Sequence, residues 1–421
     1  MKIAIIGSGI SGLTCAYLLN RQHDITIFES SDSVGGHTAT KDVNVNGQHY
    51  AIDTGFIVYN DWTYPNFIKL LDELKVVTQP TDMSFSVHCE SSGLEYGGSH
   101  LNTLFAQRRN LFKPRYWQML RDILRFNKES IADLELEKVD PDSTLGDYLH
   151  KQHYSSAFIQ DYLIPMGSAI WSASTQTMLN FPLLFFIRFF KNHGLLSVNH
   201  RPQWRVISGG SKCYLTPLKE SFKEKIKTSC RVDTVTRSEK GVTINAKGCE
   251  PESFDQVVFA CHSDQALAML AHPSIEEQRL LSAIPYQNND VVLHTDTQLL
   301  PKRKLAWSSW NYLKASNNQT AQQQASAILT YNMNILQGIV APETFCVTLN
   351  ATDKIDATKI LGRYQYAHPV FSLASEAAVK NWYTINGINR TWFCGAYWGN
   401  GFHEDGVNSA LRVTEALGVP W

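Results

Sequence analysis

The sequence lacks several features that would point to a particular class of protein. Its 421 residues contain no CxxC pair and no Cys/His pair at the spacing of a zinc site. No apolar run reaches the ~18 residues of a transmembrane helix, and internal repeats, low-complexity tracts and long linkers are missing as well. We therefore expect no metal site, and we interpret the eight scattered cysteines as reduced thiols of a cytoplasmic protein.

Neither sign of charge dominates the chain. With 38 Lys and Arg against 39 Asp and Glu, the net charge is -1, which gives no general electrostatic reason to expect a nucleic acid partner, and we expect none. Hydrophobic residues make up 43% and charged residues 18%, a composition typical of a globular protein with a sizeable core. The length favours two or three domains at ~150 residues each.

The first thirty residues carry a nucleotide-binding pattern. The apolar run Lys2 to Ile6 predicts a buried parallel strand, and GSGISG follows at 7–12. In such a GxGxxG turn the glycines allow a tight bend, the approach of a pyrophosphate to backbone N–H groups, and close packing of helix on strand. A second predicted strand ends at Glu29, whose carboxylate can accept hydrogen bonds from a ribose hydroxyl. The alternative is a plain glycine-rich turn with a surface acid, but strand, turn and acid together favour the nucleotide site.

The residues after Glu29 resemble a known family. The run GSGISG…IFESSDSVGGHTA, with the glycine pair Gly35 and Gly36, resembles the N-terminal signature of the flavin-containing amine oxidase and phytoene desaturase superfamily. This resemblance implies FAD rather than NAD, with the glycine pair against the pyrophosphate and the flavin. His37 stands where these families usually carry Arg, so its role near the flavin is open. The SGGC-type cysteine site of some amine oxidases is absent, and we expect FAD that is bound without a covalent link.

Further segments resemble the same superfamily. Residues 231–235 and 254–260 resemble the returning strands of the FAD domain, where the backbone of Val232 contacts the adenine. Residues 393–410 (FCGAYWGNGFHEDGVNSA) resemble the last flavin-binding strand, loop and helix. A helix start there would stabilise the anionic reduced flavin, although a capped surface helix is the plainer alternative. The cofactor-binding residues implied are Gly7, Gly9, Ile10, Ser11, Gly12, Glu29, Ser30, Gly35, Gly36, His37, Thr54, Gly55, Val232, Gly395, Glu404, Asp405, Gly406 and Val407.

Within the superfamily, five short runs resemble one bacterial branch of NAD/FAD-binding oxidoreductases. That branch is often encoded beside cyclopropane-fatty-acid-synthase-like methyltransferases, and such neighbours imply lipid acyl chains as substrates. The runs are PMGSAIWS (165–172), AWSSWNYL (306–313), TYNMNILQ (330–337), VTLN (347–350) and HPVF (368–371).

We expect an α/β fold with two domains. Residues 1–80, 202–265 and 385–421 are predicted to form a discontinuous Rossmann-type FAD-binding domain, and residues 81–201 and 266–384 a second α+β substrate-binding domain with a mixed sheet and helices. The sequence has a single GxGxxG, so a second domain dedicated to NADPH is not supported. This favours a reaction in which an organic substrate, rather than a bound nicotinamide, donates electrons to the flavin.

The candidate catalytic residues are Tyr397, Trp398, His403 and Lys304. Tyr397 and Trp398 follow the flavin-binding glycine, where amine oxidases present aromatic residues to the substrate, but packing in the core is equally open. His403 could act as an acid, a base or a flavin anchor, and a structural role is favoured because a helix start lowers imidazole basicity. By resemblance to amine oxidases, Lys304 could hold a water near flavin N5; the alternative is an exposed lysine without a role.

Two stretches bear on the substrate and on membranes. Residues 181–190 (FPLLFFIRFF) could be an interfacial helix or a tunnel wall, although a buried helix is favoured. Residues 101–136 have helical periodicity, and residues 101–128 carry seven basic side chains against one acid with apolar side chains between them. Such a face can adsorb to an anionic membrane, and a solvated cationic face is the plainer alternative. We expect weak, reversible binding to anionic vesicles and so leave open a peripheral location at the inner face of the membrane.

We predict an FAD-dependent oxidoreductase that takes hydride from a C–H bond of an apolar substrate, in the first place a fatty-acyl or lipid chain, by dehydrogenation or desaturation. Three alternatives remain: a flavin amine oxidase that produces H2O2, a flavin-dependent fatty-acid isomerase, and a non-catalytic flavoprotein. The electron acceptor is open, with O2 among the options.

Overall fold

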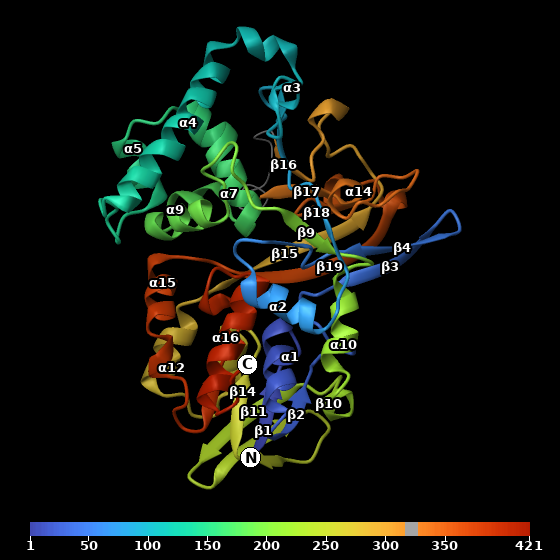
Figure 1. Cartoon of the computed structure of the whole chain (residues 1–421), viewed down its shortest axis with the longest axis vertical. Helices are drawn as coiled ribbons and strands as arrows, with labels where there is room; N and C mark the ends of the chain where they lie inside the picture. The colour runs from blue at the N-terminus through green and yellow to red at the C-terminus, as the bar shows by residue number, and fades with distance from the viewer. Residues whose placement is uncertain (316–326) are drawn as a thin grey trace.

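The structure, a computed structural model, describes residues 1–315 and 327–421. Within this part of the chain, a five-stranded parallel sheet forms the lower half of the molecule and includes strands from both ends of the sequence (Figure 1). The strands, in spatial order, are β10 (Ile226–Lys227), β2 (Asp24–Phe28), β1 (Lys2–Ile6), β14 (Gln256–Phe259) and β20 (Thr391–Phe393).

Strand β1 is apolar throughout because both faces of its sheet are covered. Ile3 and Ile5 pack into one core, while Ala4 and Ile6 pack into another on the opposite face. The first face is covered by α1 (Ile10–Leu19), α2 (Pro65–Glu73), α10 (Leu215–Lys219) and α16 (His403–Ala416). The second is covered by β11 (Val232–Ser238), β12 (Gly241–Ala246) and β13 (Glu252–Phe254) with α11 (Ser263–Met269), α12 (Ile275–Ser282) and α15 (Leu373–Lys380).

A seven-stranded mixed sheet of the described residues lies above the parallel sheet, and its long strands cross the middle of the molecule (Figure 1). Neighbouring strands pair antiparallel except β16 and β7, which are parallel. In order, they are β19 (Ile360–Pro369), β15 (Tyr286–His294), β18 (Cys346–Leu349), β17 (Ile328–Asn332), β16 (Trp310–Lys314), β7 (Phe85–Cys89) and β8 (Leu94–Gly97).

Two small sheets join these halves. The first is the hairpin of β3 (Thr40–Val45) and β4 (Gln48–Asp53). The second has the order β5 (Val58–Asn60), β9 (Trp204–Ile207) and β6 (Thr78–Pro80). The short helix α14 (Met333–Leu336) follows β17 of the mixed sheet. The predicted α/β class with a parallel sheet and a mixed sheet is confirmed. The strands of the two large sheets come from the two sets of residues predicted for two domains, but the domain boundaries themselves stay a prediction.

Helices form the upper end of the molecule (Figure 1). The periodic stretch 101–136 is broken before Pro114, because proline favours the first turn of a new helix; α3 ends at Leu104 and a 3₁₀ turn at Arg108–Phe112 precedes α4. No helix of residues 1–315 or 327–421 is long and apolar enough to cross a membrane. The helices are α3 (Leu101–Leu104), α4 (Pro114–Glu135), α5 (Leu145–Lys151), α6 (Ser156–Phe158), α7 (Ile164–Trp171), α8 (Thr175–Leu179) and α9 (Leu183–Asn192).

Helix α9 contains most of the aromatic run 181–190. From the sequence, this run could be an interfacial helix, a tunnel wall or a buried helix. Phe186, Phe189 and Phe190 are buried, and they pack in one cluster with Trp171 of α7. Arg188 is the exposed residue between them. This helix is therefore part of the core of the upper half.

Candidate flavin site

The turn after β1 has the geometry that its glycines predict. Gly7 has a φ of +104°, and a Cβ there would lie 2.6 Å from the carbonyl oxygen of Ala260. A Cβ on Gly12 would lie 2.0 Å from the carbonyl oxygen of Gly7. Both positions therefore require glycine for the close packing of α1 on the strand.

The start of α1 fits an anionic ligand. Gly9 is the N-cap and offers no side chain, so the N–H groups of the first turn, including those of Ile10 and Ser11, have no cap among the described residues. A Cβ on Gly9 would meet nothing within 4 Å, so there is open space beside the turn. A buried helix start with free donors and space before it is suited to a pyrophosphate.

Glu29 lies at the end of β2, directly beside this turn. Its Oε2 accepts hydrogen bonds from the Ser8 backbone N–H at 3.0 Å and the Ser8 hydroxyl at 2.5 Å, and its Oε1 accepts one from the Ser31 N–H at 2.8 Å. The hydroxyl of Ser30 is a more distant donor, at 3.3 Å from Oε1. The carbonyl of Glu29 accepts from the N–H of Cys230, which brings the start of β11 at Val232 to the same edge of the sheet.

The glycine pair packs against the nucleotide turn. The N–H of Gly35 donates to the carbonyl of Ser8 at 3.0 Å, and a Cβ on Gly36 would lie 3.1 Å from the Cα of Gly9. On the other side, a Cβ on Gly55 would lie 2.2 Å from the carbonyl oxygen of His37. The predicted segments around Gly7, Gly35 and Thr54 therefore meet in space.

His37 belongs to a group of uncharged histidines. Its ring centroid lies 5.5 Å from that of His368 and 6.0 Å from that of His262. Burial first, and then the other two histidines, lower the pKa of His37 to about 3; burial and His262 lower that of His368 to about 4. All three pKa values are lowered, so the imidazoles are neutral at pH 7.

Hydrogen bonds fix opposite tautomers on two of these rings. The Asn289 amide donates to His368 Nδ1 at 2.9 Å, so the proton of His368 is on Nε2; Asn350 in turn donates to the Asn289 oxygen at 2.9 Å. His37 hydrogen-bonds the backbone of Ala367, while its Nε2 is enclosed and has no partner in the described structure. His37 therefore offers an acceptor and His368 a donor at the end of β19.

His403 begins α16 and acts as an anchor. Its ring stacks on Phe56 with centroids 3.4 Å apart, and its Nε2 lies 3.1 Å from the Thr38 hydroxyl and 3.2 Å from the Tyr214 hydroxyl. Burial lowers the pKa of His403 well below its usual value. These contacts are structural in kind, and both the structural role that the sequence favoured and the acid or base role stay predictions.

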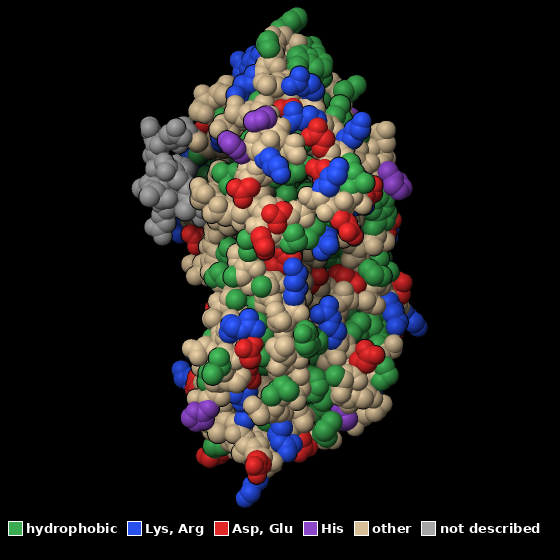
Figure 2. Space-filling model, turned by 90° about the vertical axis from the view of Figure 1, so that its left-hand side faces the viewer, with side chains coloured by type: hydrophobic (Ala, Val, Ile, Leu, Met, Phe, Trp, Pro, Cys, Tyr) green, Lys and Arg blue, Asp and Glu red, His purple; other side chains and the backbone are tan. Residues whose placement is uncertain are grey.

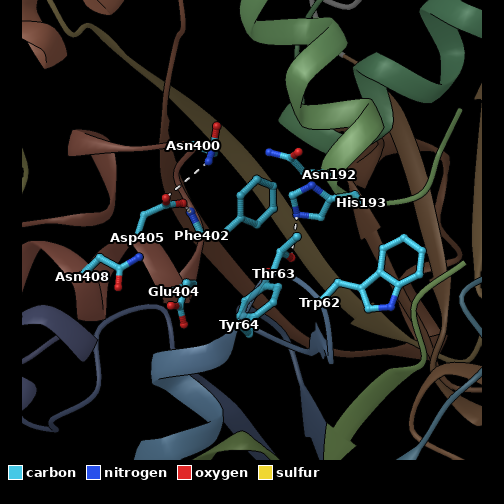
Figure 3. Close-up of a pocket in the computed structure, with 10 residues that line it drawn as sticks. All are labelled: Trp62, Thr63, Tyr64, Asn192, His193, Asn400, Phe402, Glu404, Asp405 and Asn408. Atoms are coloured by element: carbon cyan, nitrogen blue, oxygen red, sulfur yellow. Dashed lines mark hydrogen bonds between the residues drawn. The ribbon is translucent and has the colours of Figure 1, made fainter. Parts of the chain in front are cut away.

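Glu404 and Asp405 line a cavity of about 380 Å³ beside the start of α16 (Figure 3). The two oxygens of Glu404 accept from the backbone N–H groups of Asn66 and Phe67, at 3.1 and 2.8 Å, and so cap α2. Asp405 accepts from the N–H of Phe402 at 3.0 Å, and burial raises its pKa to about 6. The other lining residues are Trp62, Thr63, Tyr64, Asn192, His193, Asn400, Phe402 and Asn408.

Close packing brings the two ends of the chain together. A Cβ on Gly406 would lie 2.7 Å from Ile10 Cγ2, so α16 crosses α1 at its first turn, and Val407 is buried in the same core. The Ser409 hydroxyl accepts from the N–H of Gly395 at 2.8 Å, which fixes the loop between β20 and α16. The residues predicted from the opening turn and from the closing helix are therefore neighbours.

Of the predicted catalytic residues, two are buried in the core and a third lies apart from the other site residues. Tyr397 and Trp398 are buried in the core on the second face of the parallel sheet, with their ring centroids 4.9 Å apart. Lys304 is exposed beside β8 and α3, with its Nζ 5.6 Å from the centre of the Trp307 ring, so the structure does not bring it to the other site residues. Catalytic roles for these three stay predictions.

The sequence did not single out His262, His368, Asn289 or Phe56. His368 was within the HPVF segment that resembled the bacterial branch, but a resemblance gives no role to a single side chain. Phe56 follows Gly55, and its contact with His403 depends on the packing of segments almost 350 residues apart. These contacts form only when β4, β15, β19 and α16 meet.

The uncapped helix start, the carboxylate of Glu29 and the two glycine segments fit FAD, and they define an FAD-dependent oxidoreductase. The family model of the flavin-containing amine oxidoreductases matches residues 10–337, more than half of the chain. The protein belongs to this family.

Relatives of known structure share the fold over the whole chain. Cyclohexylamine oxidase from Brevibacterium oxydans IH-35A has a TM-score of 0.68 at 14% identity, with 99% of each chain covered. The CLA-producing fatty acid isomerase from P. acnes has a TM-score of 0.69 at 15% identity, with 98% of each chain covered. The 15-cis-phytoene desaturase of Synechococcus elongatus is 37% identical over 78 residues; this match covers 18% of the chain but just 15% of the desaturase.

Proposed function

We propose that this enzyme takes hydride from a C–H bond of an apolar substrate, with a fatty-acyl or phospholipid chain as the favoured class. The observation that carries the proposal is an aromatic cluster at the loop before α16. The Phe402 ring stacks on Phe189 with centroids 5.3 Å apart, and Phe371, which follows β19, stacks on Phe185 at 5.0 Å. Phe402 lines the cavity in Figure 3 and packs against the buried cluster that contains Phe371, so an apolar cluster lies next to the closing helix, which suits a hydrocarbon better than a charged substrate.

The uncharged histidines support the same proposal. FAD, when bound, supplies the acceptor for a hydride equivalent, so the protein has to orient the substrate, exclude water and fix the polar groups around the ring. His37 and His368 provide a fixed acceptor and a fixed donor without a net charge. The start of α16 adds a partial positive charge, and His403 holds it against Phe56.

A second candidate is an amine oxidase, and the cavity in Figure 3 favours it. Carboxylates of Glu404 and Asp405 with the rings of Tyr64 and Phe402 are the kinds of groups that surround an ammonium ion. Burial raises the pKa of both carboxyl groups, that of Asp405 to about 6, so the attraction from Asp405 weakens near pH 6 and below. This candidate predicts H2O2 release with primary or secondary amines.

Anaerobic reduction of the purified yellow protein separates these functions. Acyl lipids, free fatty acids and amines are added in turn, flavin bleaching is recorded, and products are analysed by mass spectrometry. Bleaching by an acyl substrate with a product two mass units lighter supports our proposal. Bleaching by amines alone would overturn it in favour of the amine oxidase, and a product of unchanged mass would indicate an isomerase.

A variant links the result to the aromatic cluster. We expect Phe371→Ala to raise the KM for the acyl substrate about tenfold, because a buried aromatic contact of ~1.5 kcal/mol is lost. Tyr383→Ala is the control, since Tyr383 is exposed. Bound FAD per protein should be unchanged in both, and equal KM values would contradict an acyl chain beside Phe371.

A further inference from the structure

The upper end of the molecule leaves large apolar side chains in water. Phe112 is 86% exposed, Leu101 76%, Leu124 59% and Trp117 49%. All four lie within residues 101–128, which we call the tip: α3, the 3₁₀ turn Arg108–Phe112 and the first part of α4. Single exposed apolar residues are common, but a group of this size on one segment is typical of an interaction surface.

Helix α4 carries large apolar side chains on two faces. One contains Tyr116, Met119 and Phe126 and is buried in the upper half of the molecule. On the outward face, Trp117, Arg121, Leu124 and Lys128 follow one another at spacings of four, three and four residues, so they form one stripe of alternating apolar and basic side chains. Packing within the fold explains the first face but not the second.

The charge of the tip differs from that of the rest of the chain. Residues 101–128 carry seven basic side chains and one acid, Asp122, so their charge is +6; subtracting this from the total of -1 leaves -7 for the other residues. Asp122 is buried, accepts from the N–H of Ser155 and lies 3.9 Å from the Arg121 guanidinium and 3.6 Å from that of Arg125, so it does not face outward but pairs with two of the basic side chains. Figure 2 shows hydrophobic side chains at the upper end of the molecule with Lys and Arg side chains close by.

Several tip residues are held in place rather than free. Arg108 donates to the carbonyl of Phe105 at 2.8 Å, and Arg109 donates to that of Gly93, also at 2.8 Å. The indole N–H of Trp117 donates to the carbonyl of Leu111 at 2.9 Å, which fixes the ring on the surface. The 3₁₀ turn is therefore held in place by these hydrogen bonds while Phe112 at its end stays exposed.

We propose that the tip docks on an anionic lipid bilayer, with the apolar side chains in the acyl boundary and the Lys and Arg side chains among the headgroups. Lipid is the occupant that uses both kinds of side chain. A nucleic acid would pair with the cations but leave Phe112 and Leu101 in water. This surface lies outside the flavin site, so the proposal holds whatever the substrate is.

Co-sedimentation of the FAD-loaded protein with vesicles tests this proposal. We expect it to pellet with vesicles of phosphatidylcholine and phosphatidylglycerol at a ratio of 7:3 in low salt, to be released by 0.5 M NaCl, and to stay in solution with phosphatidylcholine alone. Equal pelleting with both vesicles, or none with either, overturns the proposal. Salt-sensitive binding to duplex DNA without vesicle binding would assign the tip to nucleic acid instead.

Two variant pairs locate the binding. Arg121→Gln with Lys128→Gln should weaken binding to the anionic vesicles roughly 25-fold, at roughly fivefold for each charge near the surface. Leu101→Ser with Phe112→Ser should weaken it at least tenfold at every salt concentration at which the wild type binds. The controls are Lys240→Gln with Lys247→Gln and Ile275→Ser with Val340→Ser, exposed residues outside the tip. FAD content and melting temperature verify folding, and controls that lose as much binding as the tip variants overturn the assignment.

Discussion

Glu29 shows how one side chain is fixed for its role by the fold itself. Hydrogen bonds from Ser8 and Ser31 hold the carboxylate at the end of β2, beside the uncapped start of α1. Because the carboxylate is already desolvated and oriented, a ribose hydroxyl gains a charged acceptor at little further cost. The residue is therefore suited to binding the adenosine half of FAD.

Removing this carboxylate should weaken FAD binding. We expect Glu29→Ala to raise the Kd for FAD roughly tenfold or more, since hydrogen bonds to a charged group contribute about 1.5–3 kcal/mol. Asp32→Ala, an exposed acid three residues further along the chain, serves as the control. Titration of each apoprotein with FAD, monitored by fluorescence quenching, gives the Kd of both variants. Equal Kd values would rule out the predicted role of Glu29.

The neutral histidines should make stability depend on pH. The folded pKa of His368, about 4, lies below the unfolded value of about 6.5, so the unfolded chain binds more protons between these values. Its contribution to stability is therefore present above pH 6.5 and is lost as the pH falls toward 4. Asp405, with a pKa raised to about 6, titrates in the opposite sense, and its contribution is lost as the pH rises through 6.

His368→Gln isolates the histidine contribution. Urea unfolding between pH 7.5 and 4.5 should show a smaller decrease in the free energy of unfolding for this variant than for the wild type, by up to about 3 kcal/mol. Exposed His272→Gln should leave the pH dependence unchanged. Parallel curves for His368→Gln and the wild type would show that His368 titrates normally in the folded protein.

At the scale of elements, the strand-turn-helix at the N-terminus depends on two glycines for different reasons. A side chain at Gly12 would collide with the Gly7 backbone, whereas a side chain at Gly9 would enter open space. We therefore expect the first position to be needed for folding, and the second to keep the start of α1 accessible to phosphate.

Alanine at these positions should separate stability from binding. We expect Gly12→Ala to destabilise the apoprotein by about 1–3 kcal/mol through overpacking against backbone that cannot move aside. Gly9→Ala should leave the apoprotein as stable as the wild type and weaken FAD binding at least tenfold. Chemical denaturation and FAD titration of both variants give the comparison, and a Gly9→Ala variant with normal FAD affinity would contradict phosphate binding at this turn.

Elements formed by neighbouring residues were predictable from the sequence. The strand-turn-helix around Gly7 and the loop-helix at His403 depend on local glycine and apolar patterns, and the structure contains both. The contacts of Glu404 with Asn66 and Phe67 were not predictable, because a carboxylate at a helix start looks the same in sequence whether it faces a ligand or another helix. The tautomers of His37 and His368 depend on Asn289 and Ala367, which only the fold brings together.

At the scale of the whole molecule, the flavin site joins segments from both ends of the chain. We expect residues near Gly9, Glu29 and Val232 to contact the AMP half of FAD, and residues near Gly406 to contact the flavin end. A ligand that contacts all of them stabilises the folded protein through every segment at once.

FAD should therefore raise the melting temperature of the apoprotein more than FMN does. At 100 times its Kd, FAD stabilises the folded state by about 2.7 kcal/mol, a shift of several degrees for a protein of this size. FMN lacks the AMP half and leaves Glu29 without a ligand, so it should produce a much smaller shift at equal concentration. Equal shifts would show that the flavin end alone supplies the affinity.

The capping of α2 by Glu404 has a mechanical consequence for the cavity in Figure 3. One wall of the cavity consists of the starts of α2 and α16, which the two hydrogen bonds of Glu404 hold together. The facing wall, at the end of α9, contacts the first through the His193–Thr63 hydrogen bond and the stack of Phe189 on Phe402. A bulky ligand that enters the cavity should therefore displace α9 rather than α2 or α16. We expect the largest conformational fluctuations around the cavity in that helix.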